Sequence, residues 1–497
     1  MSIIFLNGLC QLNAQSLEHL KQATPIKFSS GMSFQTSFYN VQSIPYRKQP
    51  FNWNFSGTPV ISIYGIQFPF SFYVSNQQLG YQQPFNQVGI HPTYKWITAH
   101  LGYSSVRFSD YTLAGRRFLG AGLELMPGQW RLGFIYGRFQ KAVERDSIVQ
   151  STPQGYLSGV PQGAFARKGY AIKLGYGTAK NYFDLIYLKA SDDTLSLASP
   201  LSLQALSPEQ NKVVGLAHHF STKSGIFWES DAALSLYTSN IHAEPVDTND
   251  LPGILYSWAE PKLSSQWLYA ISSRVGYEGK NVKAALRYRR ISRDFKTMGA
   301  YYFLTDMEEY AVQCSSGLWK KKVQARGNFG IQQNNLGHNR LETTRKIIAS
   351  IYTGAQFGRS LHVDLSYSNF GITQRPQQPW VADSIRIDQV LSSWQAAVNY
   401  QLPLSSPQTI SIQLNIQNLE PRDTANHQVS AIKAFNGTLV YTLSVPARKL
   451  NFTFLLQRIQ NQQAAVEVGS TGAGLNVGKS FMKGKLAIQA GLHLYTT

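Results

Sequence analysis

The sequence has no run of about 18 uncharged apolar residues, which is the minimum for a helix that spans a bilayer. A protein that crosses a membrane with apolar helices is therefore excluded. Cysteine is also scarce, because the chain holds only Cys10 and Cys314. If an export signal is removed near Gln15, Cys314 remains alone and no intramolecular disulfide can form. Stability must then come from backbone pairing and packing.

Motifs for catalysis and for cofactors are missing as well. We find no serine elbow of the G-x-S-x-G type, no H-E-x-x-H and no P-loop, so the sequence predicts neither an enzyme nor a bound cofactor. The ten histidines are dispersed, and the adjacent His218 and His219 would point to opposite faces of a strand. The oxygen-bearing residues between His242 and Asp250 do not have the spacing of an EF-hand loop. We therefore expect no metal site.

Acidic residues are few, 27 against 46 Lys and Arg, which gives a formal net charge of +19. A basic balance raises nucleic acid as a partner. Binding of single strands requires aromatic side chains interleaved with basic ones on one surface. Here the aromatic residues, which make up 13% of the chain, fall on the apolar faces of candidate strands. The sequence therefore predicts no nucleic-acid partner.

The strongest pattern present is the alternation of apolar and polar residues, which is typical of strands with two different faces. In residues 410–417, Ile410, Ile412, Leu414 and Ile416 alternate with Ser411, Gln413, Asn415 and Gln417. The chain is 43% hydrophobic, yet its mean hydropathy is −0.21. Alternation alone favours a soluble sandwich and a membrane barrel equally, because both expose one face of each strand to a different environment.

The connections separate these alternatives. From about residue 129 onward, long and short gaps between candidate strands alternate strictly, with tight turns such as 178–181, 357–360 and 445–448. Long loops outside and short turns inside are the arrangement of outer-membrane barrels, whereas a sandwich with crossovers has no reason to keep that order. We therefore predict an all-β fold, a large antiparallel transmembrane up-and-down β-barrel of about 22 to 24 strands with short periplasmic turns and long extracellular loops.

Counting candidates gives about 23 strands, although single-chain bacterial barrels are normally even. The early candidates are 31–42, 50–64, 66–76, 88–96, 97–107, 112–125 and 129–142. Either one early strand is miscounted, or a closing strand lies beyond residue 497. We divide the chain into a probable export signal at 1–15, a periplasmic segment or plug at 16–30 that can form a short helix, and the barrel at 31–497.

Basic residues gather in the short turns. The predicted periplasmic rim comprises Lys180, Lys223, Lys280, Lys321, Arg359, Arg448 and Lys483. Such a rim would attract the anionic headgroups of the lipid leaflet beside it. The alternative, that solvated turns simply favour lysine, stays open.

A second basic group falls on strand faces. In residues 282–289, Val282, Ala284, Leu286 and Tyr288 share the apolar face, so the cations between them should face the lumen, since cations cost about 2–4 kcal/mol on the lipid face. The predicted lumen-facing basic wall is Lys283, Arg287, Arg289, Arg326 and Lys173, and His362 and Asp364 are predicted lumen-facing polar residues. The wall would favour anionic solutes, unless acids on neighbouring strands, such as Asp231, Glu229 or Asp364, neutralise it.

One stretch is similar to a known group. Residues 55–65, with sequence FSGTPVISIYG, and the following 68–72 and 75–78 resemble uncharacterised outer-membrane barrel proteins of the Bacteroidota. Residues 83–90, 94–96, 100–103 and 111–115 are similar to the same group, and the resemblance covers about the first 180 residues. It implies a barrel in the cell envelope but brings no activity or site residue with it.

Two functions follow from these patterns. The first is a porin-like barrel of the bacterial outer membrane that gives passage to small solutes, with anionic solutes as one option. The second is a non-conducting accessory or structural subunit of a secretion or barrel-assembly complex, because a barrel of this size would leak unless it is plugged. The expected partners are outer-membrane lipid and, for the second function, other envelope proteins.

Overall fold

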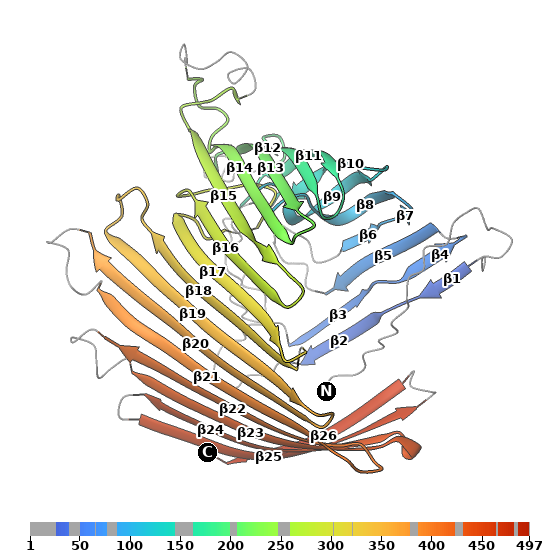
Figure 1. The fold of residues 1–497 in the computed structure, drawn as a ribbon. Helices are drawn as coiled ribbons and strands as arrows, with labels where there is room; N and C mark the ends of the chain where they lie inside the picture. Colours follow the sequence, from blue (N-terminus) through green and yellow to red (C-terminus); the bar gives the residue numbers. More distant parts are fainter. Residues whose placement is uncertain are drawn as a thin grey trace. The chain divides into compact units, whose positions relative to one another are not determined.

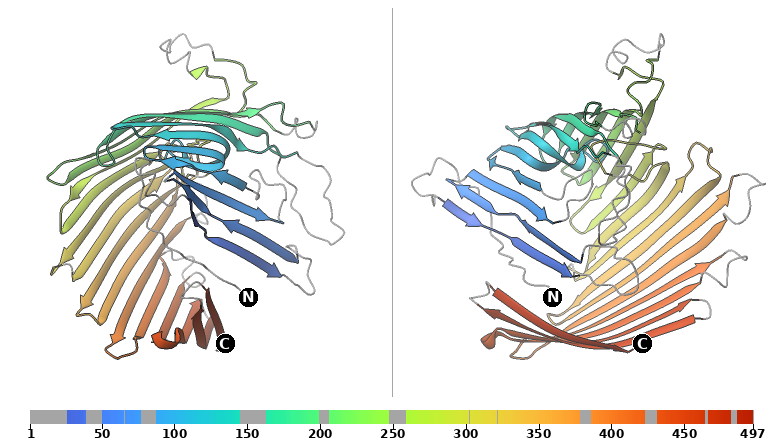
Figure 2. Two further views of the ribbon diagram at one scale, coloured as in Figure 1. Left: turned by 90° about the vertical axis from the view of Figure 1, so that its right-hand side faces the viewer. Right: turned by 180° about the vertical axis from the view of Figure 1, so that it is seen from behind.

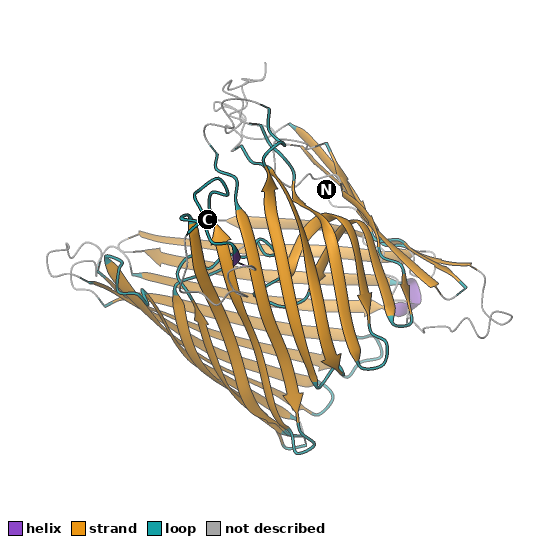
Figure 3. Ribbon diagram, turned by 90° about the horizontal axis from the view of Figure 1, so that it is seen from above, coloured by secondary structure: helices purple, strands orange, loops and turns teal. Residues whose placement is uncertain are grey.

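The computed structural model describes residues 26–38, 50–64, 66–76, 87–144, 163–198, 206–246, 259–301, 303–320, 322–377, 386–422, 431–463, 466–481 and 486–496. These residues form 26 strands of one sheet, and the described strand pairs are antiparallel. Figure 3 shows how far strands outweigh loops. The predicted all-β class is confirmed: the described strands form one antiparallel up-and-down sheet. In the described part of the chain, no helix has the length and apolar character needed to cross a membrane.

The chain divides into two compact units. The first comprises the described residues of Met1–Phe220, Ser230–Ile271 and Asp294–Phe303, and the second those of Ser221–Glu229, Ser272–Arg293 and Leu304–Thr497. The strands β14 (Ile226–Thr238) and β15 (Ser265–Glu278) contribute residues to both units.

The first unit begins with short strands and continues with longer ones. They are β1 (Ile26–Ser29), β2 (Met32–Phe38), β3 (Phe51–Gly57), β4 (Val60–Ile63), β5 (Ile66–Ser75), β6 (Gln87–Ile90), β7 (Thr93–Tyr94), β8 (Ile97–Arg107), β9 (Ala114–Leu125), β10 (Trp130–Gln140), β11 (Ala166–Gly177), β12 (Tyr182–Asp193) and β13 (Gln210–Ser221). Each of β8 to β12 pairs with the next strand in the chain.

Six of the short elements are halves of three broken strands. β1 pairs with β4 while β2 pairs with β3, so β1 with β2 and β3 with β4 form two strands side by side. β5 pairs with both β6 and β7, which together form a third. Merging these halves leaves 23 strands among the described residues, the number counted from the sequence. The sheet begins at Ile26 rather than at residue 31, because β1 already pairs along β4. The predicted export signal at 1–15 lies outside the described residues.

The second unit is a regular meander. Its strands are β16 (Val282–Ile291), β17 (Met307–Leu318), β18 (Val323–Asn334), β19 (Glu342–Phe357), β20 (Leu361–Pro376), β21 (Ile387–Leu402), β22 (Gln408–Pro421), β23 (Ile432–Val445), β24 (Leu450–Gln463), β25 (Val466–Phe481) and β26 (Leu486–Thr496), with one turn of 3-10 helix, η3 (Pro446–Arg448). Figures 1 and 2 show β17 to β26 side by side in chain order, as their registers require. The predicted tight turn at 357–360 joins β19 to β20, and η3 provides the one at 445–448.

The second unit is a single layer with two unlike faces. In β22, Ile412, Leu414 and Ile416 are exposed on one face, as the alternation predicts. Gln413 and Gln417 are exposed on the other. No residue of β20, β21, β23 or β24 is buried. A single sheet that exposes a continuous apolar face is stable only where something apolar covers that face.

Candidate functional site

Two loops fold onto one face of the first unit. The first docked loop, residues 108–113, joins β8 to β9, and the second docked loop, residues 294–301, comes from the connection between β16 and β17. We call the face that they cover the covered face. Both loops leave the strands at the end that carries the long connections. The sequence pattern predicts only connections at these two segments and gives no sign that they fold inward.

The covered face is an apolar core. Phe118, Ile135 and Leu188 project from it and are fully buried, together with Leu113 of the first docked loop and Met298 of the second. Burying each of these side chains contributes about 1.5–3 kcal/mol. The opposite face of the same strands exposes large apolar residues, such as Phe134, Tyr136, Ile172 and Leu174. The alternation therefore located the exposed apolar face correctly, but its polar counterpart in this unit is largely a dry core.

Backbone contacts fix the second docked loop against the strands. Gly299 O accepts a hydrogen bond from Ala114 N at 2.9 Å, and Met298 N donates to Asn211 Oδ1 at 2.9 Å. Thr297 Oγ1 donates to Thr112 O of the first docked loop at 2.8 Å. Gly299 fits because it has no side chain: a Cβ there would lie 2.3 Å from Thr112 O. The two loops thus dock on each other as well as on the sheet.

A charged cluster also anchors the second docked loop. Lys296 Nζ lies 3.1 Å from both carboxylate oxygens of Glu209 and 2.8 Å from Tyr237 Oη. Arg167 donates to Glu209 at 2.8 Å and to both carboxylate oxygens of Asp192, at 2.7 and 3.1 Å. Partly buried charges are tolerated only when they are paired in this way.

Glu209 is the centre of this cluster, and it lies just before β13, outside the strands. Burial alone would raise the pKa of Glu209. The hydrogen bond from Tyr237 and the positive charges of Arg167 and Lys296 outweigh burial and hold that pKa below its ordinary value. Glu209 is therefore ionised at neutral pH and available to hold Lys296.

In the second unit, the predicted basic wall lies on the polar face. Lys283 and Arg326 share this face, because both lie opposite Ser315 of β17, and Arg287 and Arg289 follow on alternate positions of β16. The acids that pair with the wall are not the expected ones. Glu309, opposite Arg289, forms ion pairs with both Arg287 and Arg289.

The acids named from the sequence have other partners. Asp231 accepts a hydrogen bond from Asp110 N, and Glu229 pairs with Arg274 at 2.7 Å. Asp364 lies 3.0 Å from His362 Nε2 and accepts a hydrogen bond from Tyr352 Oη. The pairing with Glu309 could have been found from the sequence, because aligning the strand ends on either side of 292–306 places Arg289 opposite Glu309.

The remaining cations of the wall have other partners. Lys283 pairs with Glu278 at the end of β15, and the Arg326 guanidinium lies 5.7 Å from the centre of the Tyr352 ring. Lys280, Lys283 and Arg326 line one open cavity of about 150 Å³, and none of its described lining residues is acidic. Lys173 belongs to the covered face of the first unit, where it is buried, 3.6 Å from Glu124.

The predicted basic rim is described in part. Lys223, Lys280, Arg359 and Arg448 lie in turns of the second unit, and Lys180 lies in the β11–β12 turn of the first. In an antiparallel meander every second connection falls at the same end of the strands, so the four in the second unit share one edge. Lys321 and Lys483 lie outside the described residues.

His, Cys, Asp and Glu side chains do not gather into a metal-binding group of three or more anywhere in the described ranges. Of the acidic loop considered from the sequence, His242 and Glu244 are described, and residues 247–250 are not.

Similarity to known proteins is found among solved structures. No protein-family model matches the sequence, and no curated protein matches it. Among solved structures, the chain is similar to the P pilus usher (PapC) translocation pore, with a TM-score of 0.44 and 10% identity, over 95% of this chain and 96% of that one.

Two further similarities are weaker. OccK10 (OpdN) of Pseudomonas aeruginosa matches with a TM-score of 0.35 and 11% identity, over 75% of this chain and 97% of that one. OccAB4 of Acinetobacter baumannii matches with a TM-score of 0.30 and 9% identity, over 95% and 99%. These TM-scores lie below 0.5. The description of the fold therefore rests on the strands of this chain, and these proteins carry no argument about its function.

Proposed function

We propose that this chain is a porin-like protein of a bacterial outer membrane, through which small hydrophilic solutes pass. The observation that carries the proposal is the second unit, a single layer with an exposed apolar face and an exposed polar face. Lipid satisfies the first face and water the second, which is the environment of a barrel wall. From the resemblance of its first 180 residues or so, we also predict that the chain comes from a member of the Bacteroidota.

The solute preference that we propose is a weak one for anions. The cavity lined by Lys280, Lys283 and Arg326 supports it, because no acid is among its described lining residues, although Glu278 pairs with Lys283. Arg287 and Arg289 support it less, since Glu309 neutralises part of their charge. Rings of charged side chains set selectivity by net charge, so pairing weakens the contribution of this wall.

A second function has its own supporting observation. The docked loops fill the covered face of the first unit with a packed core that includes Met298 and Leu113. A face that is filled in this way does not conduct, which favours a non-conducting barrel in an envelope assembly. We rank passage first because the polar face of β20 to β24 has no such cover among the described residues.

Reconstitution into planar lipid bilayers separates the two functions. Stepwise conductance from the purified full chain supports passage. Electrical silence, together with envelope proteins that co-purify in fixed stoichiometry, contradicts passage and supports the accessory role. An empty-detergent preparation from the same host serves as the control for contaminating porins.

A further inference from the structure

The first unit contains a polar cavity separate from the docked loops. It has a volume of about 580 Å³ and is open to solvent. This volume lies in the range of roughly 300–1,000 Å³ that is common for sites of small ligands. Its walls come from β2, β3, β5, β6, β8 and β9 and from the break between β6 and β7.

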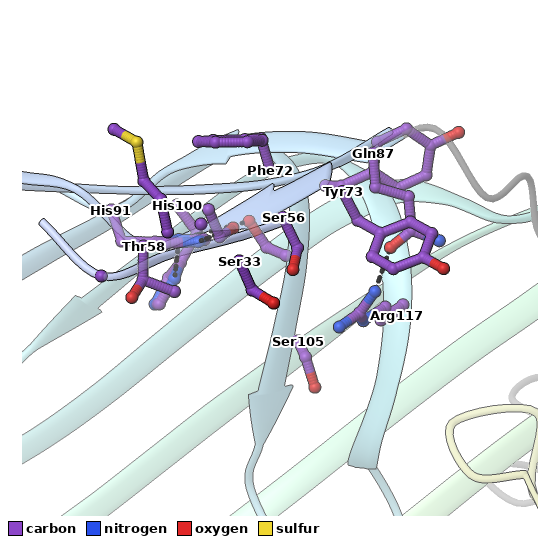
Figure 4. A pocket seen from close by; sticks show the side chains of 16 residues that line it. Ser33, Ser56, Thr58, Phe72, Tyr73, Gln87, His91, His100, Ser105 and Arg117 are labelled. Carbon is purple, nitrogen blue, oxygen red and sulfur yellow. Dashed lines mark hydrogen bonds between the residues drawn. The ribbon is translucent and has the colours of Figure 1, made fainter. Parts of the chain in front are cut away.

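Hydroxyl groups dominate the lining. Ser33, Ser56, Thr58, Ser71, Ser104 and Ser105 contribute six of them. Figure 4 shows Ser33, Ser56 and Ser105 between the imidazoles at one end and Tyr73 with Arg117 at the other. Each hydroxyl can both donate and accept a hydrogen bond, so the wall can pair with a ligand that itself carries many hydroxyls.

The register directs several of these groups toward one side, whereas Ser105 lies opposite Arg117 on the other. Ser56 lies opposite Tyr73, Ser71 opposite Gly89, and Tyr73 opposite Gln87, so their side chains share a face. Phe72, the neighbour of Tyr73, projects to the other face, where its ring fills the space beside Gly57. The Tyr73 ring is thus the aromatic surface at this end of the cavity, and an aromatic ring can stack on the C–H face of a sugar ring.

The basic groups of the lining are one arginine and two histidines. Arg117, His91 and His100 line the cavity, and no Asp or Glu is among its described lining residues. Arg117 donates a hydrogen bond to Gln87 at the wall. The His91 and His100 rings lie with Nδ1 atoms 3.3 Å apart, and His100 Nε2 contacts Glu124 at 3.0 Å. An anionic ligand group would therefore meet donors and positive charge.

We propose that this cavity binds an acidic saccharide, with the hydroxyls and Gln87 on the sugar hydroxyls, Tyr73 against a ring face and Arg117 on the acidic group. The site does not depend on whether the chain conducts solutes, so it stands or falls separately from the proposed function. It adds a binding activity to a chain for which the sequence indicated no ligand.

Calorimetric titration of the full chain in detergent tests the site. The probes are trigalacturonic acid, maltotriose as a neutral saccharide, and sodium sulfate as a bare anion. We expect trigalacturonic acid to bind most tightly. Arg117→Gln should weaken it by at least about tenfold, as expected for the loss of a charge-assisted hydrogen bond, and Tyr73→Leu should weaken it as well.

Two variants complete the design. Ser56→Ala removes one hydroxyl with little risk to folding and should weaken binding slightly. Lys168→Gln changes an exposed lysine on β11, which pairs with Asp193 outside the cavity, and should leave binding unchanged. Circular dichroism melting verifies that each variant is folded.

Four outcomes would overturn the proposal. Absence of binding by all three probes would show that the cavity is not a binding site. Equal affinities for maltotriose and trigalacturonic acid would show that the ligand needs no acidic group. Equal affinities for sulfate and trigalacturonic acid would show that the cavity recognises an anion and not a saccharide. Binding that persists in folded Arg117→Gln and Tyr73→Leu proteins places the ligand elsewhere.

Discussion

Lys296 and Glu209 are joined by two hydrogen bonds of 3.1 Å, although 87 residues separate them in the chain. Lys296 lies on the second docked loop and Glu209 lies directly before β13. This contact ties the loop to the covered face at the edge of the apolar core. On the proposed function, we predict that passage depends on how firmly this loop is held.

Replacing Lys296 tests this anchor. Lys296→Met removes the charged hydrogen bonds to Glu209 and Tyr237 and should weaken loop docking by about 1–3 kcal/mol. We expect higher single-channel conductance and faster cleavage of the loop by added protease. Lys168→Met, which removes an exposed lysine, is the matched control. An unchanged conductance with an unchanged cleavage rate would show that the anchor does not hold the loop.

A single methyl group tests the fit of the same loop. Gly299→Ala places a Cβ against the backbone oxygen of Thr112, which cannot move aside as a flexible side chain can. Overpacking of this kind costs about 1–3 kcal/mol, so we expect a lower melting temperature and a displaced loop. Gly478→Ala is the control, because its nearest neighbour is the backbone oxygen of Ile488 at 3.9 Å. Equal melting temperatures for both variants would contradict the tight docking.

The lowered pKa of Glu209 predicts how docking depends on pH. A carboxyl group with a lowered pKa in the folded state stabilises that state fully above its ordinary pKa of 4.5 and loses this contribution as pH falls through the lowered value. Conductance should stay constant from pH 7 to pH 4.5 and rise only at lower pH. Glu209→Gln should conduct more at pH 7 and lack this acid step. A transition between pH 5 and pH 7 that Glu209→Gln abolishes would contradict the assignment.

The ion pairs of the basic wall predict that removing an acid and removing a cation shift ion selectivity in opposite directions. Glu309→Gln removes the carboxylate that pairs with Arg287 and Arg289, so the reversal potential in a salt gradient should shift toward anions. Arg326→Gln removes a cation from the cavity of the polar face and should shift it toward cations. If Glu309→Gln has no effect, the wall does not line the conducting path.

The sequence predicted the strands well because alternation and tight turns are local. The strand expected at 97–107 is β8 with the same bounds, and the turn at 178–181 separates β11 from β12 as expected. The count of 23 also agrees, although it depends on merging β1 with β2 and two similar pairs. Here the short-range rules of strand geometry were sufficient.

The inward folding of the loops could not be predicted in the same way. Docking of Met298 on Asn211 and of Lys296 on Glu209 joins segments about 90 residues apart, and no periodicity records such a contact. Acid partners across the sheet were misassigned for a related reason, since Glu309 faces Arg289 only in one register. The polar cavity was missed because its hydroxyls come from several strands, each with only one or two of them.

The central claim is that the sheet has lipid on one face and water on the other, and spin labels along β22 test it most directly. In a variant without native cysteines, single cysteines at 412 to 417 are labelled after reconstitution into vesicles. We predict that labels at Ile412, Leu414 and Ile416 are accessible to oxygen, while those at Gln413, Asn415 and Gln417 are accessible to a water-soluble nickel complex. Equal accessibility at adjacent positions, without a period of two, would contradict the account.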